Sequence, residues 1–208
     1  MYTTFFKRFF DIALSFLAIL FLSWLFMLIA LAITIDDPGP VFFKQKRVGK
    51  NKKLFAILKF RSMKMSTPHD TPTHMLENPE QYITKIGKLL RKTSLDELPQ
   101  IFNIFVGQMS IIGPRPALWN QYDLIAERDK YGVNSIRPGL SGWAQINGRD
   151  ELEIPIKARL DGEYVERISF VMDWKCFWGT VKSVLKHDGV VEGGTGTINK
   201  NTEGKISL

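Results

Sequence analysis

The longest uncharged segment of the sequence, residues 12–35, constrains the fold of this chain most strongly. It reads IALSFLAILFLSWLFMLIALAITI, and its only polar side chains are Ser15, Ser23 and Thr34. A helix of this length reaches across the hydrocarbon core of a bilayer. A secretory signal peptide has a shorter apolar region followed by a small-residue cleavage site, whereas DDPGP follows here. The segment therefore predicts a membrane-inserted helix rather than a cleaved leader.

Basic residues flank this segment on both sides, and they predict its orientation. Lys7 and Arg8 precede it, and the more strongly basic stretch FKQKRVGKNKK, residues 43–53, follows it. Basic flanks favour the cytoplasmic side of a membrane, so the rest of the chain is predicted to lie there. Two topologies stay open: a re-entrant helix that leaves on the face it entered, or a span with an exported N-terminus. The second basic stretch would also attract anionic lipid, at about 1 kcal/mol per residue.

The charge and composition of the chain limit the classes of partner, cross-link and metal site that it is expected to have. The net charge of +7 favours acidic partners, which include nucleic acid, anionic lipid and phosphorylated substrates. Cys176 is the only cysteine, so an intramolecular disulfide is excluded. The three histidines do not cluster in the sequence, which argues against a zinc site.

The rest of the chain predicts a mainly helical α+β fold. Residues 40–60 contain two apolar runs around a Gly/Asn/Lys turn, which is typical of a β-hairpin. Residues 83–93 have the apolar spacing of a basic amphipathic helix, and residues 64–81 predict a loop. Residues 168–187 predict another helix, whose apolar stripe either packs on the core or lies in the membrane interface with its aromatic side chains down.

These segments suggest three regions. Residues 1–36 are predicted to form the membrane-inserted helix, 37–188 a folded domain on the cytoplasmic face, and 189–208 a flexible tail. The length of 208 residues is sufficient for one globular domain with its own core.

The stretch KTSLDELPQ, residues 92–100, places two acids side by side. Neighbouring residues on a helix point about 100° apart, so Asp96 and Glu97 can serve different purposes, one facing a substrate and the other a metal ion. The other interpretation is a capping box, with Ser94 as N-cap and Glu97 at the third helical position. The local sequence alone favours the capping box.

Two further segments are suited to phosphate. In Gly113-Pro114-Arg115-Pro116 the prolines stiffen the backbone around one arginine, which suits bidentate binding of an oxyanion as well as a plain surface turn. The loop 137–149 is glycine-rich and bracketed by two arginines, with Trp143 available to stack on a base. Carboxylates close to phosphate-binding arginines favour Mg²⁺ over zinc.

Several motifs together resemble those of the bacterial sugar transferases, the monotopic polyprenyl-phosphate phosphoglycosyl transferases. The resemblance extends over nearly the whole chain except the tail. The matching stretches are KRFFDIALS, DDPGPVFFKQKRVG, LKFRSM, GKLLRKTSLDELPQIFNIFVGQMSIIGPRPAL and RPGLSGWAQINGR, with Leu160, Asp161, Tyr164, Ser169 and Asp173 downstream.

This resemblance implies a function, with residues 37–188 as the catalytic phosphoglycosyl transferase domain. Such enzymes transfer a sugar-1-phosphate from a UDP-sugar to undecaprenyl phosphate at the cytoplasmic face of the bacterial inner membrane and release UMP. They begin the assembly of a capsule, exopolysaccharide, O-antigen or glycoprotein glycan. The implied partners are the UDP-sugar, undecaprenyl phosphate and membrane lipid, with no nucleic acid, and a homodimer is compatible with the sequence.

The resemblance also assigns roles to individual residues. Asp96 would be the nucleophile that forms a covalent aspartyl-phosphosugar, and Glu97 the Mg²⁺ ligand. A carboxyl with a reference pKa of about 3.9 is ionised at neutral pH and needs no general base. The expected phosphate-binding residues are Lys59, Arg91 and Arg115, and those expected to bind the nucleotide-sugar are Arg137, Gln145 and Arg149. Asp173 is expected to be structural.

One position departs from the family pattern. Well-described members carry Ser-Pro in the middle of the membrane helix, where the proline breaks it, but this chain has Ser23-Trp24. Tryptophan retains its N–H and imposes no break. The basic residues on both flanks still favour the re-entrant topology over a straight span. Two functional alternatives also stay open: direct transfer with Asp96 as a base, and a non-catalytic membrane-anchored adaptor that binds anionic lipid or nucleic acid.

Overall fold

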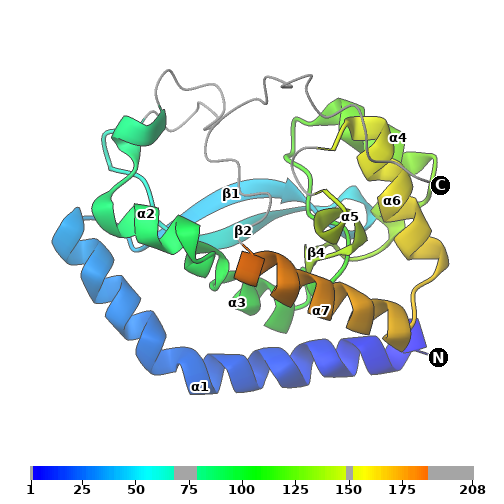
Figure 1. The fold of residues 1–208 in the computed structure, drawn as a ribbon, viewed down its shortest axis with the longest axis horizontal. Helices are drawn as coiled ribbons and strands as arrows, with labels where there is room; N and C mark the ends of the chain where they lie inside the picture. Colours follow the sequence, from blue (N-terminus) through cyan, green and yellow to red (C-terminus); the bar gives the residue numbers. More distant parts are fainter. Residues whose placement is uncertain (1, 68–78, 149–151, 187–208) are drawn as a thin grey trace.

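The computed structural model describes residues 2–67, 79–148 and 152–186 (Figure 1). It is a mainly helical α+β fold with two small two-stranded sheets, as the sequence predicts. The helices are α1 (Lys7–Asp36), α2 (Lys85–Lys92), α3 (Gln100–Phe105), α4 (Tyr122–Asp129), α5 (Trp143–Ile146), α6 (Ile154–Glu166) and α7 (Phe170–Lys186). The strands are β1 (Phe42–Val48), β2 (Leu54–Phe60), β3 (Ser110–Ile112) and β4 (Gly139–Ser141).

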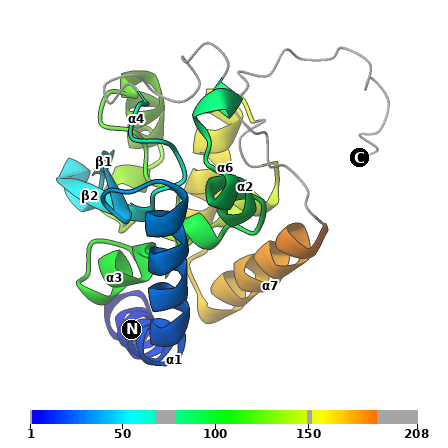
Figure 2. The same cartoon turned by 90° about the vertical axis from the view of Figure 1, so that its left-hand side faces the viewer.

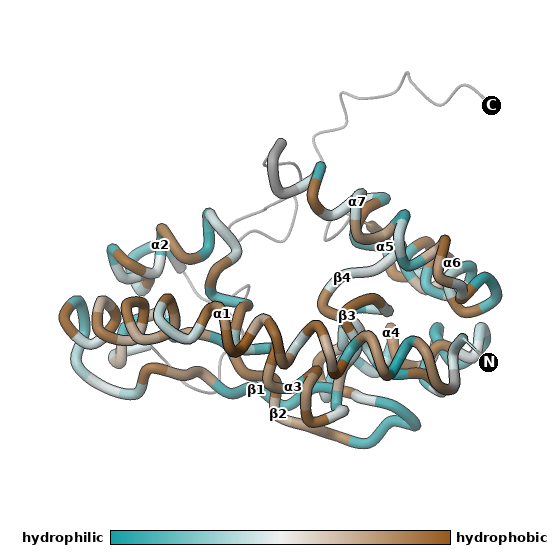
Figure 3. Tube along the Cα trace, turned by 90° about the horizontal axis from the view of Figure 1, so that it is seen from below, coloured by the Kyte–Doolittle hydropathy of each residue, from teal (hydrophilic) through white to brown (hydrophobic). Residues whose placement is uncertain are grey.

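Helix α1 contains the whole apolar segment and bends sharply in its middle (Figure 1). Most of its residues are hydrophobic (Figure 3), and large side chains such as Phe21 and Met27 are exposed. The Ser23 hydroxyl donates to Leu20 O at 2.9 Å, and serine bonds of this kind to the preceding turn favour bending. Because Trp24 keeps its N–H, the helix continues through this region as a single element.

The first half of α1 packs on the folded domain through polar contacts. The Arg8 guanidinium donates to Ile104 O and Phe105 O at 2.8 and 2.9 Å and so caps the end of α3, which lies beside α1 (Figure 2). Asp11 is buried and accepts from Ser110 Oγ at 3.0 Å and Ile111 N at 2.9 Å. These bonds fasten the start of the apolar helix to α3 and β3.

The second half of α1 packs on the same domain through apolar side chains. Ile29 and Ile33 are buried in one cluster with Phe60 of β2 and Leu90 of α2. Both ends of the helix are therefore held by one folded unit, although most of the residues between them expose apolar surface.

The predicted hairpin in residues 40–60 is confirmed. Strands β1 and β2 pair antiparallel, with Val48 opposite Leu54 and Phe42 opposite Phe60. The turn between them contains Asn51 in the left-handed conformation that asparagine tolerates. The predicted basic amphipathic helix is also confirmed as α2, where the Thr84 side chain caps the start by accepting from Gly87 N at 2.9 Å.

The segment between the hairpin and α2 is only partly described. The predicted loop of residues 64–81 ends in a 3₁₀ turn, Pro79–Tyr82, and residues 68–78 lie outside the described part of the chain.

A second, parallel pair joins β3 to β4, with Ser110 opposite Gly139 and Ile112 opposite Ser141. The two chains approach closely at Gly139, because a Cβ there would lie 2.1 Å from Gly113 N. This pair brings the GPRP segment against the glycine-rich loop, which the sequence did not predict.

The helix predicted near residues 168–187 is confirmed as α7. Of the two alternatives for its apolar stripe, packing on the core is wrong. Trp174, Phe177 and Trp178 are 53%, 43% and 47% exposed, whereas Met172 and Cys176 on the other face are buried. Asp173 accepts from Lys7 Nζ and Tyr164 Oη, both at 2.6 Å. Asp173 thus joins α7 to the N-terminal end of α1 and to α6, in keeping with the structural role predicted for it.

Candidate active site

The two adjacent acids lie in a 3₁₀ turn, Leu95–Glu97, between α2 and α3. Ser94, directly before the turn, has φ of 56° and makes no capping bond with its side chain, so the predicted capping box is wrong. Ser94 N instead donates to Arg91 O at 3.1 Å, in the left-handed conformation that often ends a helix. Ser94 therefore ends α2 and begins the 3₁₀ turn through its backbone alone, since Glu97 N donates to Ser94 O at 3.2 Å.

Glu97 is held by two cations from distant parts of the chain. Arg115 Nη2 donates to Glu97 Oε1 at 2.6 Å, and Arg115 Nη1 reaches Oε2 at 3.3 Å. Lys59 Nζ, from β2, donates to Oε1 at 2.8 Å. The two Arg115 bonds are the forked pairing that a guanidinium makes with a carboxylate. Together with the Lys59 bond they mean that Glu97 positions both cations.

Asp96 has a different environment. Its side chain is 13% exposed, and Lys59 Nζ lies 3.9 Å from Asp96 Oδ2, beyond hydrogen-bond distance. Lys59 thus stands between the two carboxylates but bonds only Glu97. Asp96 is left with an ionic contact and without the forked partner that Glu97 has.

The pKa values of the two carboxyl groups move in opposite directions. Burial raises the pKa of Asp96, which Lys59 partly counteracts and the Glu97 charge reinforces. Burial acts in the same sense on Glu97, but Arg115 and Lys59 outweigh it and hold the pKa of that carboxyl well below its usual range. The opposite shifts support the sequence-based idea that the two acids have separate roles.

All three residues predicted to bind phosphate lie around this pair of acids. Lys59 and Arg115 contact Glu97 directly, and the charge of Arg91, from α2, lowers the pKa of Asp96. The Arg91 side chain is oriented by a bond from its Nε to Ser62 Oγ at 2.9 Å. Side chains from β2, α2 and the GPRP segment thus converge on the acidic turn.

The predicted nucleotide-sugar residues occupy other surroundings. Arg137 Nε donates to Gly107 O at 3.0 Å, just after the end of α3. Gln145 Nε2 donates to Leu140 O at 3.0 Å, and its buried Oε1 lacks a hydrogen-bond partner among the residues described. Arg149 lies outside the described part of the chain. Their role in binding a nucleotide-sugar stays a prediction.

Asp96 and Glu97 are the carboxylates at this site that could hold a magnesium ion. Within the described ranges no group of three or more His, Cys, Asp or Glu side chains could form a protein-only metal site. Mg²⁺ is commonly held by one or two carboxylates together with substrate phosphates and water, and Asp96 and Glu97 supply two carboxylates. Glu97 Oε2 accepts a single bond from the described part of the chain, the long one from Arg115, and so has a lone pair available.

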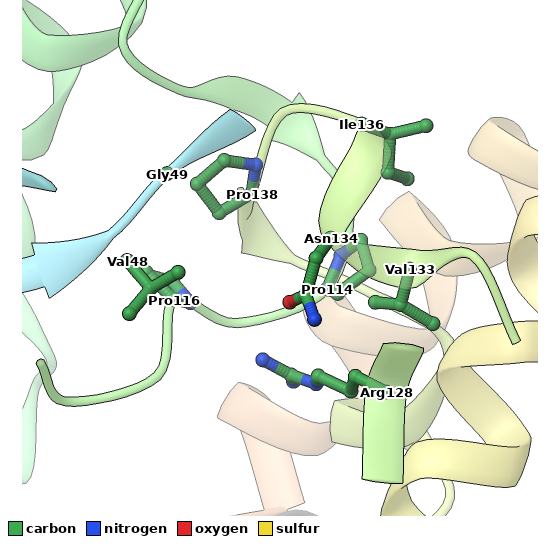
Figure 4. Close-up of a pocket in the computed structure, with 9 residues that line it drawn as sticks. All are labelled: Val48, Gly49, Pro114, Pro116, Arg128, Val133, Asn134, Ile136 and Pro138. Atoms are coloured by element: carbon green, nitrogen blue, oxygen red, sulfur yellow. The ribbon is translucent and has the colours of Figure 1, made fainter. Parts of the chain in front are cut away.

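Sequence reasoning assigned no role to the residues that support Arg115, although Asp161 is one of the positions that carry the family resemblance. Arg128 of α4 and Asp161 of α6 form a buried ion pair, with Arg128 Nη2 2.6 Å from Asp161 Oδ2. Figure 4 shows Arg128 extending from α4 toward Pro114 and Pro116, beside a small cavity that these residues line with Val133 and Asn134. No local pattern predicts this pair, because its members are 33 residues apart.

Comparison with known proteins gives consistent matches along the chain. A model of the bacterial sugar transferase family matches residues 2–187. The chain is 37% identical to the uncharacterized sugar transferase EpsL of Bacillus subtilis (strain 168), over 88% of this chain and 89% of that protein. It is 40% identical to the exopolysaccharide production protein PSS of Rhizobium leguminosarum bv. phaseoli, over 86% of this chain and 94% of that protein.

A longer relative carries a more specific name. The chain is 41% identical to the UDP-glucose:undecaprenyl-phosphate glucose-1-phosphate transferase of Escherichia coli (strain K12). The match covers 84% of this chain but 39% of that protein, so the shared region is one part of a larger protein.

Proposed function

This chain belongs to the bacterial sugar transferase family, and we propose that it transfers a sugar-1-phosphate from a UDP-sugar to undecaprenyl phosphate. The observation that carries the proposal is the pair of adjacent carboxylates with opposite pKa shifts, surrounded by Lys59, Arg91 and Arg115. The printed names of relatives support the substrate classes, since two of them use UDP-glucose or UDP-N-acetylgalactosamine with undecaprenyl phosphate.

The first half-reaction uses Asp96 as the nucleophile. One Asp96 oxygen attacks the sugar-bearing phosphorus, and the bond from that phosphorus to the UMP oxygen breaks, with the electron pair leaving on UMP. Burial supports this role because a poorly hydrated carboxylate is more reactive, while Lys59 favours its ionised form. The product is a phosphosugar bound to Asp96 through an acyl-phosphate bond.

The second half-reaction restores the enzyme. A phosphate oxygen of undecaprenyl phosphate attacks the same phosphorus, and the bond to Asp96 breaks to regenerate the free carboxylate. Each step brings an anion toward an anionic phosphorus centre, so cations must offset the repulsion. Lys59, Arg91 and Arg115 are the cations that surround the turn, and Glu97 holds two of them in position.

A magnesium ion belongs to this proposal. Glu97, with Asp96 beside it, would hold the ion together with the substrate phosphates. When bound, Mg²⁺ supplies additional positive charge to the diphosphate and to the departing UMP.

The proposed location is the cytoplasmic face of the bacterial inner membrane, with α1 as a re-entrant helix. Support comes from the contacts at both ends of α1: Arg8 and Asp11 bond the domain near one end, and Ile33 packs on it near the other. A straight span with an exported N-terminus would have to break the bonds of Arg8 and Asp11. The exposed aromatic face of α7 suits an interfacial position, with Trp174 toward lipid.

A direct test measures UMP release from a panel of UDP-sugars, with Mg²⁺ and undecaprenyl phosphate, on the full chain in lipid nanodiscs. We expect release with at least one UDP-sugar, and a phosphosugar adduct on Asp96 by mass spectrometry when the acceptor lipid is omitted. An adduct that persists in Asp96→Asn would show that the nucleophile is a different residue. Release only when both substrates are present, with no adduct, would favour direct transfer. Absence of release by the folded protein with every sugar would leave the adaptor alternative.

A further inference from the structure

The segment that carries Arg115 is held in place through four consecutive carbonyl groups. Their donors come from strands β1 and β4 and from helix α4. The bonds run from Gly139 N to Pro114 O (2.9 Å), from Arg128 Nη1 to Arg115 O (2.9 Å), from Arg47 Nη1 to Pro116 O (3.0 Å) and from Val48 N to Ala117 O (2.9 Å). Because proline has no N–H, this part of the chain offers few donors and must be anchored through its carbonyls.

Arg128 provides the bond to Arg115 itself. Its Nε and Nη2 both donate to Asp161 Oδ2, at 2.9 and 2.6 Å, which leaves Nη1 turned toward Arg115 O. Arg128 is 4% exposed and Asp161 is 1% exposed. Ion pairs buried this deeply are costly to desolvate and add little stability over apolar packing, which argues that this pair has a further use.

The backbone around Arg115 has little freedom once these bonds form. Pro114 and Pro116 have fixed φ angles, and the residue before a proline is restricted in ψ as well. The direction of the Arg115 carbonyl therefore largely determines where the Arg115 side chain starts. That side chain ends on Glu97, with Arg115 Nη2 at 2.6 Å from Glu97 Oε1.

We propose that Arg128, held by Asp161, is a positioning residue that directs the Arg115 guanidinium onto Glu97 and the substrate phosphates. Arg128 does not touch the reacting atoms; it acts through the carbonyl of Arg115. The consequence for activity rests on the function proposed above, whereas the consequence for Glu97 does not.

The informative variant is Arg128→Lys. A lysine retains the positive charge that Asp161 needs, but its single nitrogen cannot bond Asp161 Oδ2 and Arg115 O in the two directions that the guanidinium spans. We expect kcat/KM to fall by about 10- to 100-fold, the cost typical of a misplaced catalytic group. Asp129→Asn is the matched control on the same helix: Asp129 pairs with Lys52 at the surface, and asparagine keeps the oxygen that accepts from Asn134. The control should retain wild-type activity.

A double-mutant cycle separates positioning from general support of the fold. If Arg128 acts through Arg115, then Arg128→Lys should reduce the activity of an Arg115→Ala background by less than about 2-fold. Full additivity of the two losses would overturn the proposal, as would wild-type activity in Arg128→Lys. Thermal unfolding of each variant shows whether any loss follows from reduced stability alone, which would also overturn it.

A readout that does not depend on turnover completes the test. The side-chain N–H signals of Arg115, followed by NMR, report its forked contact with Glu97; they should be lost in Arg128→Lys and kept in Asp129→Asn. Unchanged Arg115 signals in Arg128→Lys would contradict the positioning role even in an active enzyme. Loss of these signals in a chain without any UMP release would support the positioning role while the proposed function fails, so the two failures are distinguishable.

Discussion

Arg115 reaches back 18 residues along the chain to bond both oxygens of Glu97, the second member of the acidic pair. Asp96, directly before it, receives no such bond and makes a 3.9 Å ionic contact with Lys59. Two neighbouring carboxylates thus differ in charge compensation, and this asymmetry leads to predictions that local sequence alone would not suggest.

Asp96→Asn and Glu97→Gln should have opposite effects on stability at neutral pH. The raised pKa of Asp96 means that ionising it opposes folding, so the neutral amide should raise the unfolding free energy, by about 0.5–2 kcal/mol. Glu97→Gln removes the partner of Arg115 and Lys59 and should lower it, by about 1–3 kcal/mol. Thermal unfolding in the same lipid nanodiscs measures both, and a loss of stability in Asp96→Asn would contradict the burial argument.

The stability that Glu97 contributes should depend on pH. Its pKa is depressed in the folded state, so the contribution is fully present above the unfolded pKa and is lost as pH falls through the folded pKa. The difference between wild type and Glu97→Gln should therefore shrink below about pH 4.3, the pKa of an unperturbed glutamate. Unfolding measured from neutral pH downward checks this, and a difference that stays constant into that acid range would exclude the linkage.

Arg115→Ala should impair catalysis and change its pH dependence. Removing the guanidinium takes charge from the phosphate site and should lower kcat by about 10²- to 10³-fold. It should also raise the pKa of Glu97, so the acidic limb of the kcat/KM profile should move to higher pH. Arg115→Lys should restore less than the full activity, because an ammonium cannot make the forked contact. An acidic limb at its wild-type position in Arg115→Ala would separate Arg115 from the protonation of Glu97.

Substitutions of Ser94 test whether its side chain caps the 3₁₀ turn or whether the position is defined by its left-handed backbone. Loss of an N-cap serine costs about 0.5–2 kcal/mol, but Ser94 makes no capping bond, so Ser94→Ala should be nearly neutral. Ser94→Gly should stabilise the protein by about 1 kcal/mol, because glycine adopts the observed φ of 56° without steric cost. Denaturation of both variants gives the answer: a costly alanine and a neutral glycine would restore the capping interpretation.

Cysteine labelling at Thr3 tests the topology. Thr3 is exposed and follows Tyr2, which bonds Asp173 of α7, so the N-terminus lies on the same side of the membrane as the domain. In the proposed topology that side is cytoplasmic. A Thr3→Cys thiol should therefore be protected from impermeant reagents added outside intact cells. It should react after the cells are opened. The native thiol should not interfere, because Cys176 is fully buried and burial raises its pKa to about 12. Labelling of Thr3→Cys in intact cells would require an exported N-terminus.

The elements that the sequence predicts well have local patterns. The hairpin, α2 and α7 each combine a clear period with a turn or a run of suitable length, and all three are present. Ser94 was ambiguous, because serine suits the start of one helix and also tolerates the end of another. The parallel pairing of β3 with β4 could not be predicted, because strands of three residues carry almost no periodic signal.

The residues of the candidate site likewise fall into those that the sequence indicates and those that only the fold brings together. The acidic pair and the GPRP arginine stand out in the sequence, and the resemblance added Lys59 and Arg91, which the fold brings to the same place. Arg128 and Asp161 could not be recognised as partners, because only the packing of α4 on α6 brings them together. The proline that breaks this helix in well-described family members is absent here, so the sequence imposed no break, yet α1 bends.

The attachment of both halves of α1 to one domain has a mechanical consequence. A catalytic unit on a single flexible tether samples a range of heights above the bilayer, whereas here no slack separates the membrane element from Asp96. Once α1 is inserted as proposed, the depth of the helix in the bilayer determines the height of the Asp96 carboxylate above it. Contacts such as Ile33 with Phe60 and Asp11 with Ile111 fix this relation. Lipid phosphates lie at a nearly constant height in the bilayer, so the insertion depth of α1 would place Asp96 at the height of the phosphate it reacts with.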